Sequence, residues 1–176
     1  MRKIAIIGCG GAGKSTFSRQ LGKVLELEVF HLDKINWKPG WVETPREELR
    51  VIQEQLVKKE SWIFDGNYGT TMDVRLNSAD TIIFLDMSRL TCMYRIVKRR
   101  WMYHKKERPD IGEGCEEKLD LEFIRWVWNF RKNRRPQLLE KIASYKANKN
   151  VIILRSRKEV ETFLEVVRMN YTEKPS

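Results

Sequence analysis

One short segment near the start of the chain, residues 8–15 (GCGGAGKS), limits the possible folds more than any other part of the sequence. It matches the pattern Gly-x-x-x-x-Gly-Lys-Ser/Thr, a phosphate-binding loop (P-loop) that joins a strand to a helix. The neighbouring sequence has the required character, because the apolar run Lys3–Ile7 precedes the loop and a helical pattern, Lys14–Leu25, follows it. The segment therefore predicts a nucleoside triphosphate site within an α/β fold.

The residue types in this loop suit the binding of phosphate groups. Glycines allow the backbone to curl so that successive N–H groups point at phosphate oxygens, and the N-terminus of the following helix adds partial positive charge. Lys14 is expected to reach the β- and γ-phosphates, and the hydroxyl of Ser15 to bind Mg²⁺. The predicted nucleotide-binding residues of the loop are Gly8, Gly10, Gly11, Ala12, Gly13, Lys14, Ser15 and Thr16.

Short apolar runs alternate with longer helical patterns along the rest of the chain. The runs are nearly continuous in apolar residues, which is typical of parallel strands that helices cover on both faces. This alternation predicts an α/β fold with right-handed crossovers, in three layers around a five-stranded parallel sheet. The expected strands are Lys3–Ile7, Glu28–Leu32, Trp62–Phe64, Thr81–Leu85 and Val151–Leu154.

Two of the expected helices begin with a capping box, in which a Ser or Thr and a Glu three residues later bond to each other's backbone N–H groups. The first box, Thr44–Glu47, starts the helix Pro45–Lys59 and places a proline at the first helical position. The second box, Ser156–Glu159, starts the helix Arg157–Val167. A further helix, Arg89–Tyr103, is expected after the fourth strand.

Residues 104–146 break the alternation, because they contain no strand pattern. Residues 104–118 have the composition of a loop, and the remainder has a helical pattern that Asp120 caps and Pro136 breaks or kinks. An insertion of this length before the last strand is often a lid over a ligand site. We therefore expect a single domain, residues 1–176, with a helical lid over about 104–146.

The predicted lid interleaves basic and aromatic side chains, and three interpretations stay open. The lid could close over ATP and supply an arginine to the phosphates. It could bind nucleic acid, with basic groups on phosphates and aromatic rings on bases. Alternatively, the aromatic rings belong to the core and the charges face solvent. The residues concerned are Arg125, Trp126, Trp128, Phe130, Arg131, Lys132, Arg134 and Arg135.

Two carboxylates follow predicted strands and are candidates for binding Mg²⁺ through water. Asp65 ends the segment SWIFD, and Asp86 ends the segment TIIFLD. Acidic residues at strand ends near a P-loop hold the metal in this class of site, although either could simply cap a turn. His31 and His104 have no partners at the spacing of a metal site or a catalytic triad, so structural roles are predicted for both.

The charge balance favours an anionic partner. The chain has 34 Lys and Arg against 24 Asp and Glu, a net charge of +10, which suits nucleotides or nucleic acid but also fits a solvated basic surface. Its three cysteines form no C-x-x-C pair, as expected in a reducing compartment. No signal-peptide or membrane-span pattern is found. A soluble, cytoplasmic protein is expected, with a monomer favoured.

Two other classes of P-loop protein are not supported. The segment ANKN, residues 147–150, lacks the acid of the guanine-binding N-K-x-D motif, and no D-x-x-G follows a strand. At 176 residues the chain is short for a ring-forming motor ATPase. The sequence therefore favours transfer of the γ-phosphate to a second substrate.

The helix Arg89–Tyr103 has two different faces. Arg95 and Arg99 lie one turn apart on one side, and beside a P-loop two aligned guanidinium groups suggest a clamp on phosphates. The alternative is a basic face in solvent. An apolar stripe at helical spacing lies opposite the arginines and consists of Leu90, Tyr94, Val97 and Trp101.

These segments together resemble a known family. The stretch DGNY, followed by ADTIIFLDMSRLTCMYRIVKRR, is similar to the corresponding strands and lid-entry helix of adenylate-kinase-like phosphotransferases. The ordered set HLDKINWKPGW, WIFDGNY, ADTIIFLD and RSRKEV resembles the bacterial DNA topology modulation proteins of the same superfamily. The resemblance extends from Met1 to about Phe163 and implies a nucleoside-kinase-like P-loop fold.

The resemblance also implies roles for individual residues. Arg95 would lie against the base or phosphates of ATP, and Arg99 would contact the transferring phosphoryl group. Asp65 would be the preferred Mg²⁺–water ligand, and Ser156 in the segment RSRKEV would lie near the adenine. Lys14 and the two arginines would then be catalytic, through positioning and charge neutralisation.

The sequence departs from the adenylate kinases in its acceptor site. Those enzymes have a Pro-Arg after their D-G-F, and this arginine holds the acceptor's phosphate, whereas the first arginine after DGNY here is Arg75. Asp33, after the second strand, could bind or deprotonate an acceptor hydroxyl, and Lys34 or Arg75 could bind an anion. Trp37 and Trp41 could form an aromatic wall or pack a loop onto the core.

Taken together, the sequence predicts an Mg²⁺- and ATP-dependent kinase that phosphorylates a small molecule, with nucleotides among the candidate acceptors. The alternative is an ATP-regulated nucleic-acid-binding protein that affects DNA topology. A kinase is distinguished by acceptor-dependent formation of ADP, and a nucleic-acid-binding protein by salt-dependent affinity for DNA.

Overall fold

The protein is built around one five-stranded parallel sheet. The computed structural model describes residues 1–103, 111–112, 114–115 and 120–172. The strands run in the order β2-β5-β1-β6-β7, and every pair of neighbours is parallel, which confirms the predicted α/β fold. Their bounds are β1 Lys3–Gly8, β2 Val29–His31, β5 Trp62–Asp65, β6 Thr81–Leu85 and β7 Asn150–Leu154.

The central strand β1 explains why the apolar runs are continuous rather than alternating. Its residues Ile4–Ile7 are fully buried, because successive side chains point to opposite faces of the sheet and helices cover both faces. Ile4 lies opposite Ile63 of β5 and Thr81 of β6, so β1 is paired along both edges. All five strands point the same way, and their carboxyl ends therefore meet at one edge of the sheet, where ligands of such folds bind.

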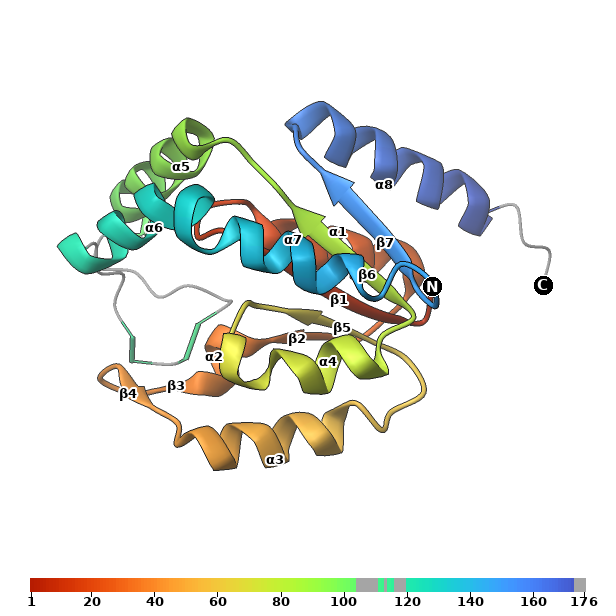
Figure 1. Cartoon of the computed structure of the whole chain (residues 1–176), viewed down its shortest axis with the longest axis horizontal. Coiled ribbons are helices and arrows are strands. Elements are labelled where there is room, and N and C mark those ends of the chain that lie inside the picture. Colours follow the sequence, from red (N-terminus) through yellow and green to blue (C-terminus); the bar gives the residue numbers. More distant parts are fainter. Residues whose placement is uncertain (104–110, 113, 116–119, 173–176) are drawn as a thin grey trace.

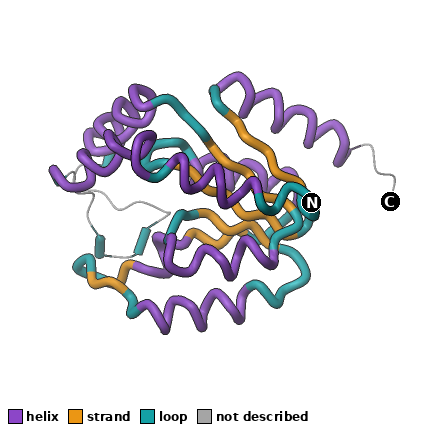
Figure 2. The backbone as a smooth tube through the Cα atoms, in the orientation of Figure 1, coloured by secondary structure: helices purple, strands orange, loops and turns teal. Residues whose placement is uncertain are grey.

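Helices cover both faces of this sheet (Figures 1 and 2). On one face α1, Lys14–Leu25, packs against α8, Arg157–Thr172. The other face carries α4, Met72–Ser78, and α7, Arg135–Ala143, with α3, Arg46–Leu56, outside α4 (Figure 1). The arrangement follows from right-handed crossovers, since the chain moves from β1 toward β2 through α1 and returns across the sheet through the later helices.

Three of the predicted helix boundaries are confirmed. The Ser156 Oγ accepts a hydrogen bond from the Glu159 backbone N–H at 3.1 Å, and the Glu159 carboxylate accepts one from the Arg155 backbone N–H. The Asp120 Oδ1 accepts from the Phe123 N–H at 2.6 Å and begins α6, Leu121–Asn133. The predicted break falls at Arg134, where α6 ends and α7 begins.

The predicted capping box at Thr44 is wrong. Helix α3 begins at Arg46, Pro45 precedes it as the N-cap residue, and no side chain caps its N-terminus. The Thr44 hydroxyl instead donates to the Ile35 carbonyl oxygen at 3.1 Å. Thr44 is therefore used to anchor the preceding loop rather than to start the helix.

Several short elements were not expected from the sequence. After β2 the chain forms α2, Leu32–Asn36, and an antiparallel hairpin of β3, Trp37–Lys38, and β4, Val42–Glu43. A 3₁₀ turn, Gly69–Thr71, precedes α4. These elements are too short for a periodic pattern, and they place Asp33 and the two predicted aromatic residues beside the strand ends.

Helix α5, Arg89–Met102, does not pack on the core through the apolar stripe that its sequence pattern shows. The apolar stripe does not face the core: Leu90, Tyr94, Val97 and Trp101 are 53% to 82% exposed. Cys92 and Ile96 are buried instead, at 1% and 0% exposure. The helix therefore packs through a narrower face next to Arg95.

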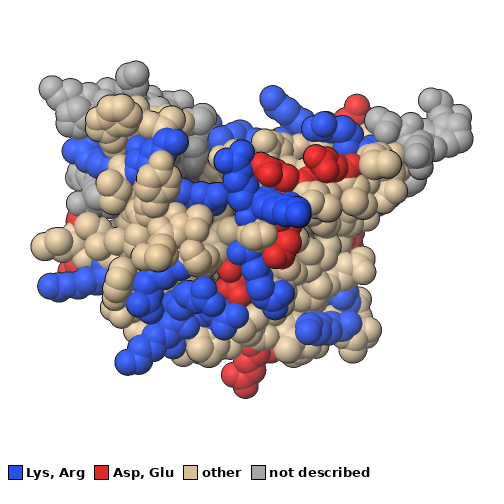
Figure 3. Space-filling view, turned by 90° about the horizontal axis from the view of Figure 1, so that it is seen from above, with Lys and Arg blue, Asp and Glu red and all other residues tan. Residues whose placement is uncertain are grey.

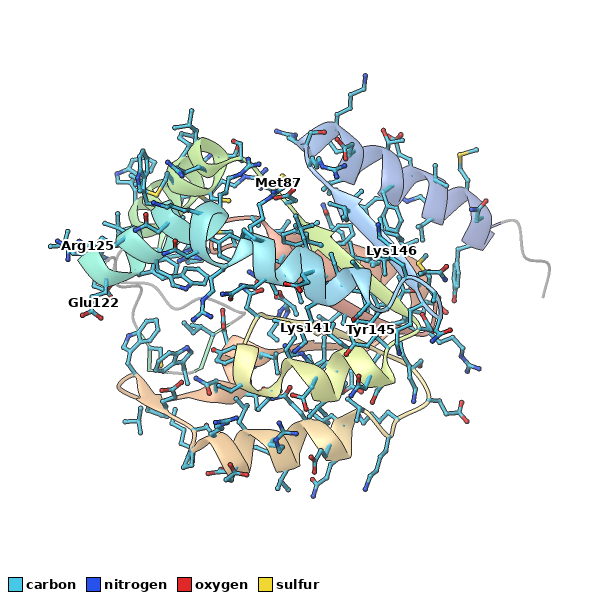
Figure 4. The ribbon with its side chains drawn as sticks, viewed as in Figure 1. Met87, Glu122, Arg125, Lys141, Tyr145 and Lys146 are labelled. Carbon is cyan, nitrogen blue, oxygen red and sulfur yellow. The ribbon has the colours of Figure 1, made fainter. Side chains whose placement is uncertain are left out.

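The insertion forms α6 and α7, and α6 packs both on α5 and on α7. In α7, Arg135 donates two hydrogen bonds of 2.7 Å to the Asp86 carboxylate after β6. Tyr145, beyond the end of α7, donates to the side chain of Asn77 in α4. Figure 4 shows Lys141 and Tyr145 on the side that faces α4. Residues 104–110, 113 and 116–119 of the predicted lid lie outside the described part of the chain. Among the described residues, none of the helices is both long and apolar enough to cross a membrane.

Candidate active site

The P-loop lies between β1 and α1 at the carboxyl edge of the sheet. Gly11 has a φ of 76° and approaches the carbonyl oxygen of Cys92 on α5 so closely that a Cβ would collide with it. Gly13 has a φ of 94° and directly precedes α1, which begins at Lys14. Both positions need a left-handed backbone that glycine adopts at low cost, so the loop can curl with its N–H groups inward.

Two cations are held against the P-loop backbone. The Lys14 ammonium donates to the Cys9 carbonyl oxygen at 3.1 Å, and the Arg95 guanidinium donates to the Ala12 carbonyl oxygen at 2.8 Å. Arg99, one turn further along α5, lies over the ring of Phe123, 5.8 Å from its centre. The structure therefore brings the three predicted catalytic side chains to the same part of the fold.

A cavity of about 1070 Å³ opens at this edge of the sheet, and the P-loop forms part of its wall. The start of α8 lines one end, above β7, with Arg157, Val160 and Leu164. The opposite end, above β2, is lined by Asp33 and the β3–β4 hairpin. A pocket of 300–1,000 Å³ is typical for small ligands, so this cavity has room for a nucleotide and a second molecule.

Helix α6 forms a third wall and rests directly on the P-loop. A Cβ on Gly10 would lie 2.8 Å from the Phe123 ring and 3.1 Å from Val127. Phe123 and Trp126 line the cavity, and Val127 and Phe130 are buried. The aromatic residues of α6 thus serve as cavity wall and core.

The described basic residues of the insertion are not among the residues that line the cavity. None of the five predicted lid cations, all of which the structure describes, lines the cavity, and Arg135 is bonded to Asp86. Figure 4 shows Arg125 at the outer end of α6, pointing away from the body of the protein. Among the described residues, the cations that line the cavity come from other elements and are Lys14, Arg19, Arg95, Lys98, Arg99 and Arg157.

The two candidate metal-binding carboxylates have different surroundings. Asp86 accepts both hydrogen bonds from Arg135, so its charge is already matched. Asp65 is 4% exposed and its Oδ2 lies 2.9 Å from the His31 Nδ1, whereas its Oδ1 is buried without a hydrogen-bond partner among the described residues. A buried carboxylate oxygen of this kind suits a metal-bound water, because leaving it unbonded is costly.

Asp33 and three aromatic residues, Trp37, Trp41 and Tyr68, line the end of the cavity above β2. The Tyr68 hydroxyl donates to the Asp33 Oδ1 at 2.8 Å. Burial raises the pKa of Tyr68, and the nearby Asp33 charge raises it further, so this phenol stays protonated at neutral pH. Trp37 and Trp41 meet edge to face, with ring centres 5.3 Å apart, and both line the cavity.

The prediction that Arg75 contacts the acceptor is wrong. Arg75 is 1% exposed and does not line the cavity. Its guanidinium donates to the side chain of Gln53 and to the carbonyl oxygens of Gly66 and Asn67, at 3.2 and 2.8 Å. Burial lowers the pKa of Arg75 to about 9. Its donors are used inside the protein to hold the loop after β5.

Four other predicted residues, Gly8, Lys34, Asp65 and Ser156, are not among the residues that line the cavity. Lys34 is exposed on α2 and does not line it. The Ser156 hydroxyl oxygen accepts a hydrogen bond that caps the start of α8. Its neighbour Arg157 does line the cavity.

Asn67 is a site residue that the sequence analysis missed. Its side-chain amide donates to the Gly8 carbonyl oxygen at 2.6 Å, and its Oδ1 accepts from the Gly8 N–H at 3.0 Å. This pair of bonds joins the loop after β5 to the P-loop. The available signal was an amide side chain two residues after a strand-ending aspartate, which becomes informative only once β5 and β1 are known to be neighbours.

Charge is distributed unevenly around the site. Figure 3 shows the face that carries α5 and α8, where lysines and arginines are spread widely and acidic side chains gather mainly toward α8. The cations that line the cavity, among them Lys14, Arg95 and Arg99, attract polyphosphates. The fold and site together define a protein with the P-loop kinase fold.

Comparison with solved structures supports the same fold. Shikimate kinase from Acinetobacter baumannii, solved with shikimate, matches with a TM-score of 0.60 at 16% identity, over 100% of this chain and 96% of that one. An unliganded sugar kinase from Janibacter sp. HTCC2649 matches with a TM-score of 0.50 at 16% identity, over 98% of this chain and 95% of that one. No protein-family model and no curated protein matches the chain.

Proposed function

We propose that this protein is a kinase that transfers the γ-phosphate of Mg·ATP to a small molecule. The observation that carries the proposal is the arrangement of Lys14, Arg95 and Arg99 at one cavity that extends beyond the P-loop on both sides. One end, at α8, is placed for the adenine, and the other, at Asp33, is placed for an acceptor. An enzyme that only hydrolyses ATP has no need of the second end.

The proposed mechanism relies on position and charge rather than on covalent chemistry, as is general for phosphoryl transfer. The P-loop N–H groups and Lys14 bind the β- and γ-phosphates. Arg95 and Arg99 neutralise the charge that spreads over the phosphoryl group as it moves. Helix α6 limits the access of water, because Phe123 lies against the P-loop at Gly10.

Ser15 and Asp65 are the residues that would hold Mg²⁺. The chemistry of these donors fits, since a hydroxyl and a carboxylate are ligands that Mg²⁺ accepts directly or through water. The buried Asp65 Oδ1 without a hydrogen-bond partner supports this role. Bound Mg²⁺ would supply charge neutralisation between the β- and γ-phosphates.

The test is formation of ADP by the purified protein in the presence and absence of candidate acceptors. Lys14→Ala should abolish the acceptor-dependent rate, and Arg99→Ala should lower it. Arg125→Ala is a matched control, because this arginine lies on the outside of α6. An acceptor-dependent rate that Lys14→Ala leaves unchanged would contradict the assignment of the loop.

A nucleic-acid-binding role is the second candidate, and it rests on the exposed side of the insertion. Arg125, Arg131, Lys132 and Arg134 are exposed there, and Trp128 is 47% exposed beneath Arg89. This combination and the resemblance to DNA topology modulation proteins favour contact with phosphates and bases. DNA affinity that falls steeply with salt, and that weakens when Arg131 and Arg134 are replaced by alanine, would support it.

A further inference from the structure

Two polar side chains end neighbouring strands at the carboxyl edge of the sheet. His31 is the last residue of β2 and Asp65 is the last residue of β5, and the parallel pairing of these strands places the two residues directly opposite each other. The His31 Nδ1 lies 2.9 Å from the Asp65 Oδ2. The two residues are 34 positions apart in the sequence, so no local motif contains both.

Both side chains lie on the face of the sheet that α1 covers. Gly22 of α1 packs on Val29 of β2 and Ile63 of β5, because a Cβ on Gly22 would lie 2.5 Å from the Val29 Cγ2 and 3.7 Å from the Ile63 Cδ1. Side chains two residues apart in a strand point to the same face of the sheet. His31 and Asp65, each two residues further along its strand, therefore share the α1 face.

The first turn of α1 lies at the same edge of the sheet, because the P-loop joins the end of β1 to the start of this helix. That turn carries Ser15, so the two residues proposed to hold Mg²⁺, Ser15 and Asp65, lie on one face at one edge. His31 stands beside Asp65 on the side of β2. It is not among the residues that line the cavity, so its contact is with the proposed metal ligand rather than with the nucleotide.

The contact holds one oxygen of the Asp65 carboxylate. An ionised carboxylate only accepts hydrogen bonds, so the His31 Nδ1 is the donor. The side chains of His31 and Asp65 are 11% and 4% exposed, and water therefore competes little for this bond. The other oxygen, the Asp65 Oδ1, is buried and has no hydrogen-bond partner among the described residues. A carboxylate held through Oδ2 is hindered from rotating, and its Oδ1 stays available to another donor.

We propose that His31 is a positioning residue for the magnesium site. Through its hydrogen bond to the Asp65 Oδ2 it holds the carboxylate so that the Asp65 Oδ1 can accept a hydrogen bond from a metal-bound water. The inference rests on the proposed kinase function and on the roles given there to Ser15 and Asp65. Partners that orient metal ligands typically contribute about 10- to 100-fold to metal affinity, so the effect is large enough to measure.

The test measures the ATP affinity of the full-length protein by calorimetry, once in excess EDTA and once in excess Mg²⁺. The ratio of the two dissociation constants is the gain in affinity that the metal brings. His31→Phe keeps a ring but removes the donor, and it should reduce this gain about tenfold while the affinity without metal stays the same. If His31→Phe does not fold, His31→Leu serves as the donor-free variant.

The conservative variant His31→Asn should restore most of the gain. Its amide nitrogen is a donor and is separated from Cα by the same number of bonds as the histidine Nδ1. A variant that only repaired packing would have no reason to restore the effect of the metal. A gain as small in His31→Asn as in His31→Phe would count against the hydrogen bond as the cause.

A double variant shows whether His31 acts through Asp65. Asp65→Asn by itself should reduce the gain at least as much as His31→Phe. The double variant should be no worse than Asp65→Asn, because His31 has then lost the group that it positions. Glu28→Gln is the matched control and should leave the gain unchanged, since the pair of Glu28 and Lys59 joins the segments that lead into the same two strands at their other end.

Three results would overturn the inference and leave His31 with a structural role only. They are an unchanged gain in His31→Phe, an equal loss of ATP affinity with and without Mg²⁺, and losses from His31→Phe and Asp65→Asn that add in the double variant. In each of these cases ATP binding that depends on Lys14 leaves the kinase proposal standing. If ATP binding does not depend on Lys14, the kinase proposal fails, and the inference fails with it.

Discussion

Asn67 and Arg75 link the two halves of the site through the loop that follows β5. Asn67 bonds twice to Gly8 in the P-loop, and Tyr68 beside it bonds to Asp33. Arg75 holds this loop from beneath through the carbonyl oxygens of residues 66 and 67. A single three-residue segment therefore sets the distance between the phosphate-binding loop and the acceptor end.

Replacing Asn67 by alanine should weaken ATP binding without unfolding the protein. Two hydrogen bonds to the P-loop are lost, and a loss of about 1.4 kcal/mol corresponds to about tenfold weaker binding. The measurement is titration of the purified variant with ATP by calorimetry. Asn77→Ala is the control, because Asn77 is an exposed asparagine that bonds to Tyr145 away from the cavity. Unchanged ATP affinity in Asn67→Ala would show that the P-loop keeps its shape without this residue.

The two candidate carboxylates should respond differently to replacement by asparagine. Asp65→Asn should raise the Mg²⁺ concentration needed for half-maximal ADP formation about tenfold, as expected for a ligand that acts through water. Asp86→Asn should leave this concentration unchanged and lower the free energy of unfolding by about 2 kcal/mol, because it leaves Arg135 without its carboxylate. A larger Mg²⁺ effect for Asp86→Asn would reverse the assignment.

At the scale of elements, helix α5 both packs on the core and carries Arg95 into the cavity, and its hydrophobic pattern does not distinguish these two roles. Its inner face packs Cys92 and Ile96 against the sheet and the P-loop, and the same face carries Arg95 into the cavity. The wider apolar stripe is left in solvent. The helix is held by a few deeply buried residues rather than by its most hydrophobic side.

Substitutions on the two faces of α5 should therefore differ in their effect on stability. Ile96→Ala should lower the free energy of unfolding by about 2–5 kcal/mol, because Ile96 is fully buried. Trp101→Ala should change it by no more than about 0.5 kcal/mol, because Trp101 is 82% exposed. Urea unfolding followed by circular dichroism provides the measurement. Comparable losses for both variants would mean that the helix is turned the other way.

At the scale of the whole molecule, Asp80 ties the start of the chain to the sheet and makes stability depend on pH. Its carboxylate accepts hydrogen bonds from the backbone N–H groups of Arg2 and Lys3, at 2.7 and 2.8 Å, and from the Thr81 hydroxyl. Burial by itself would raise the pKa of Asp80, but these hydrogen bonds outweigh it and lower the pKa below its ordinary value.

Acid should therefore weaken the fold through Asp80. A carboxylate with a lowered folded-state pKa contributes stability above its unfolded pKa, and this contribution is lost as the pH falls through the folded value. Asp80→Asn should cost about 1 kcal/mol at pH 7, with solvent screening limiting the effect. The difference from the natural protein should shrink below about pH 4. Urea unfolding at a series of pH values checks this, and a constant difference down to pH 2 would contradict it.

The sequence by itself determined the class of fold and the position of the P-loop. The P-loop is a contiguous segment, so its glycines, Lys14 and Ser15 are close in space wherever the chain goes next. The five strands are continuous apolar runs because both faces of a parallel sheet are covered, and that pattern is local. Arg95 could be identified as well, since its place on a helix that follows a strand directs it toward the same edge of the sheet.

Tertiary structure alone decided the rest. Arg75 was expected in the site but is buried, because burial depends on which helices pack over a residue. Asn67 was not expected there but bonds to the P-loop, because that contact requires β5 to lie beside β1. Arg135 is distant from Asp86 in sequence and reaches it only when α7 packs on the sheet, and this pairing favours the proposal that Asp65 rather than Asp86 serves the metal. The acceptor end is likewise assembled from three segments, α2, the hairpin and the loop after β5. Each is too short to have a pattern of its own, and only the packing of the sheet brings them together.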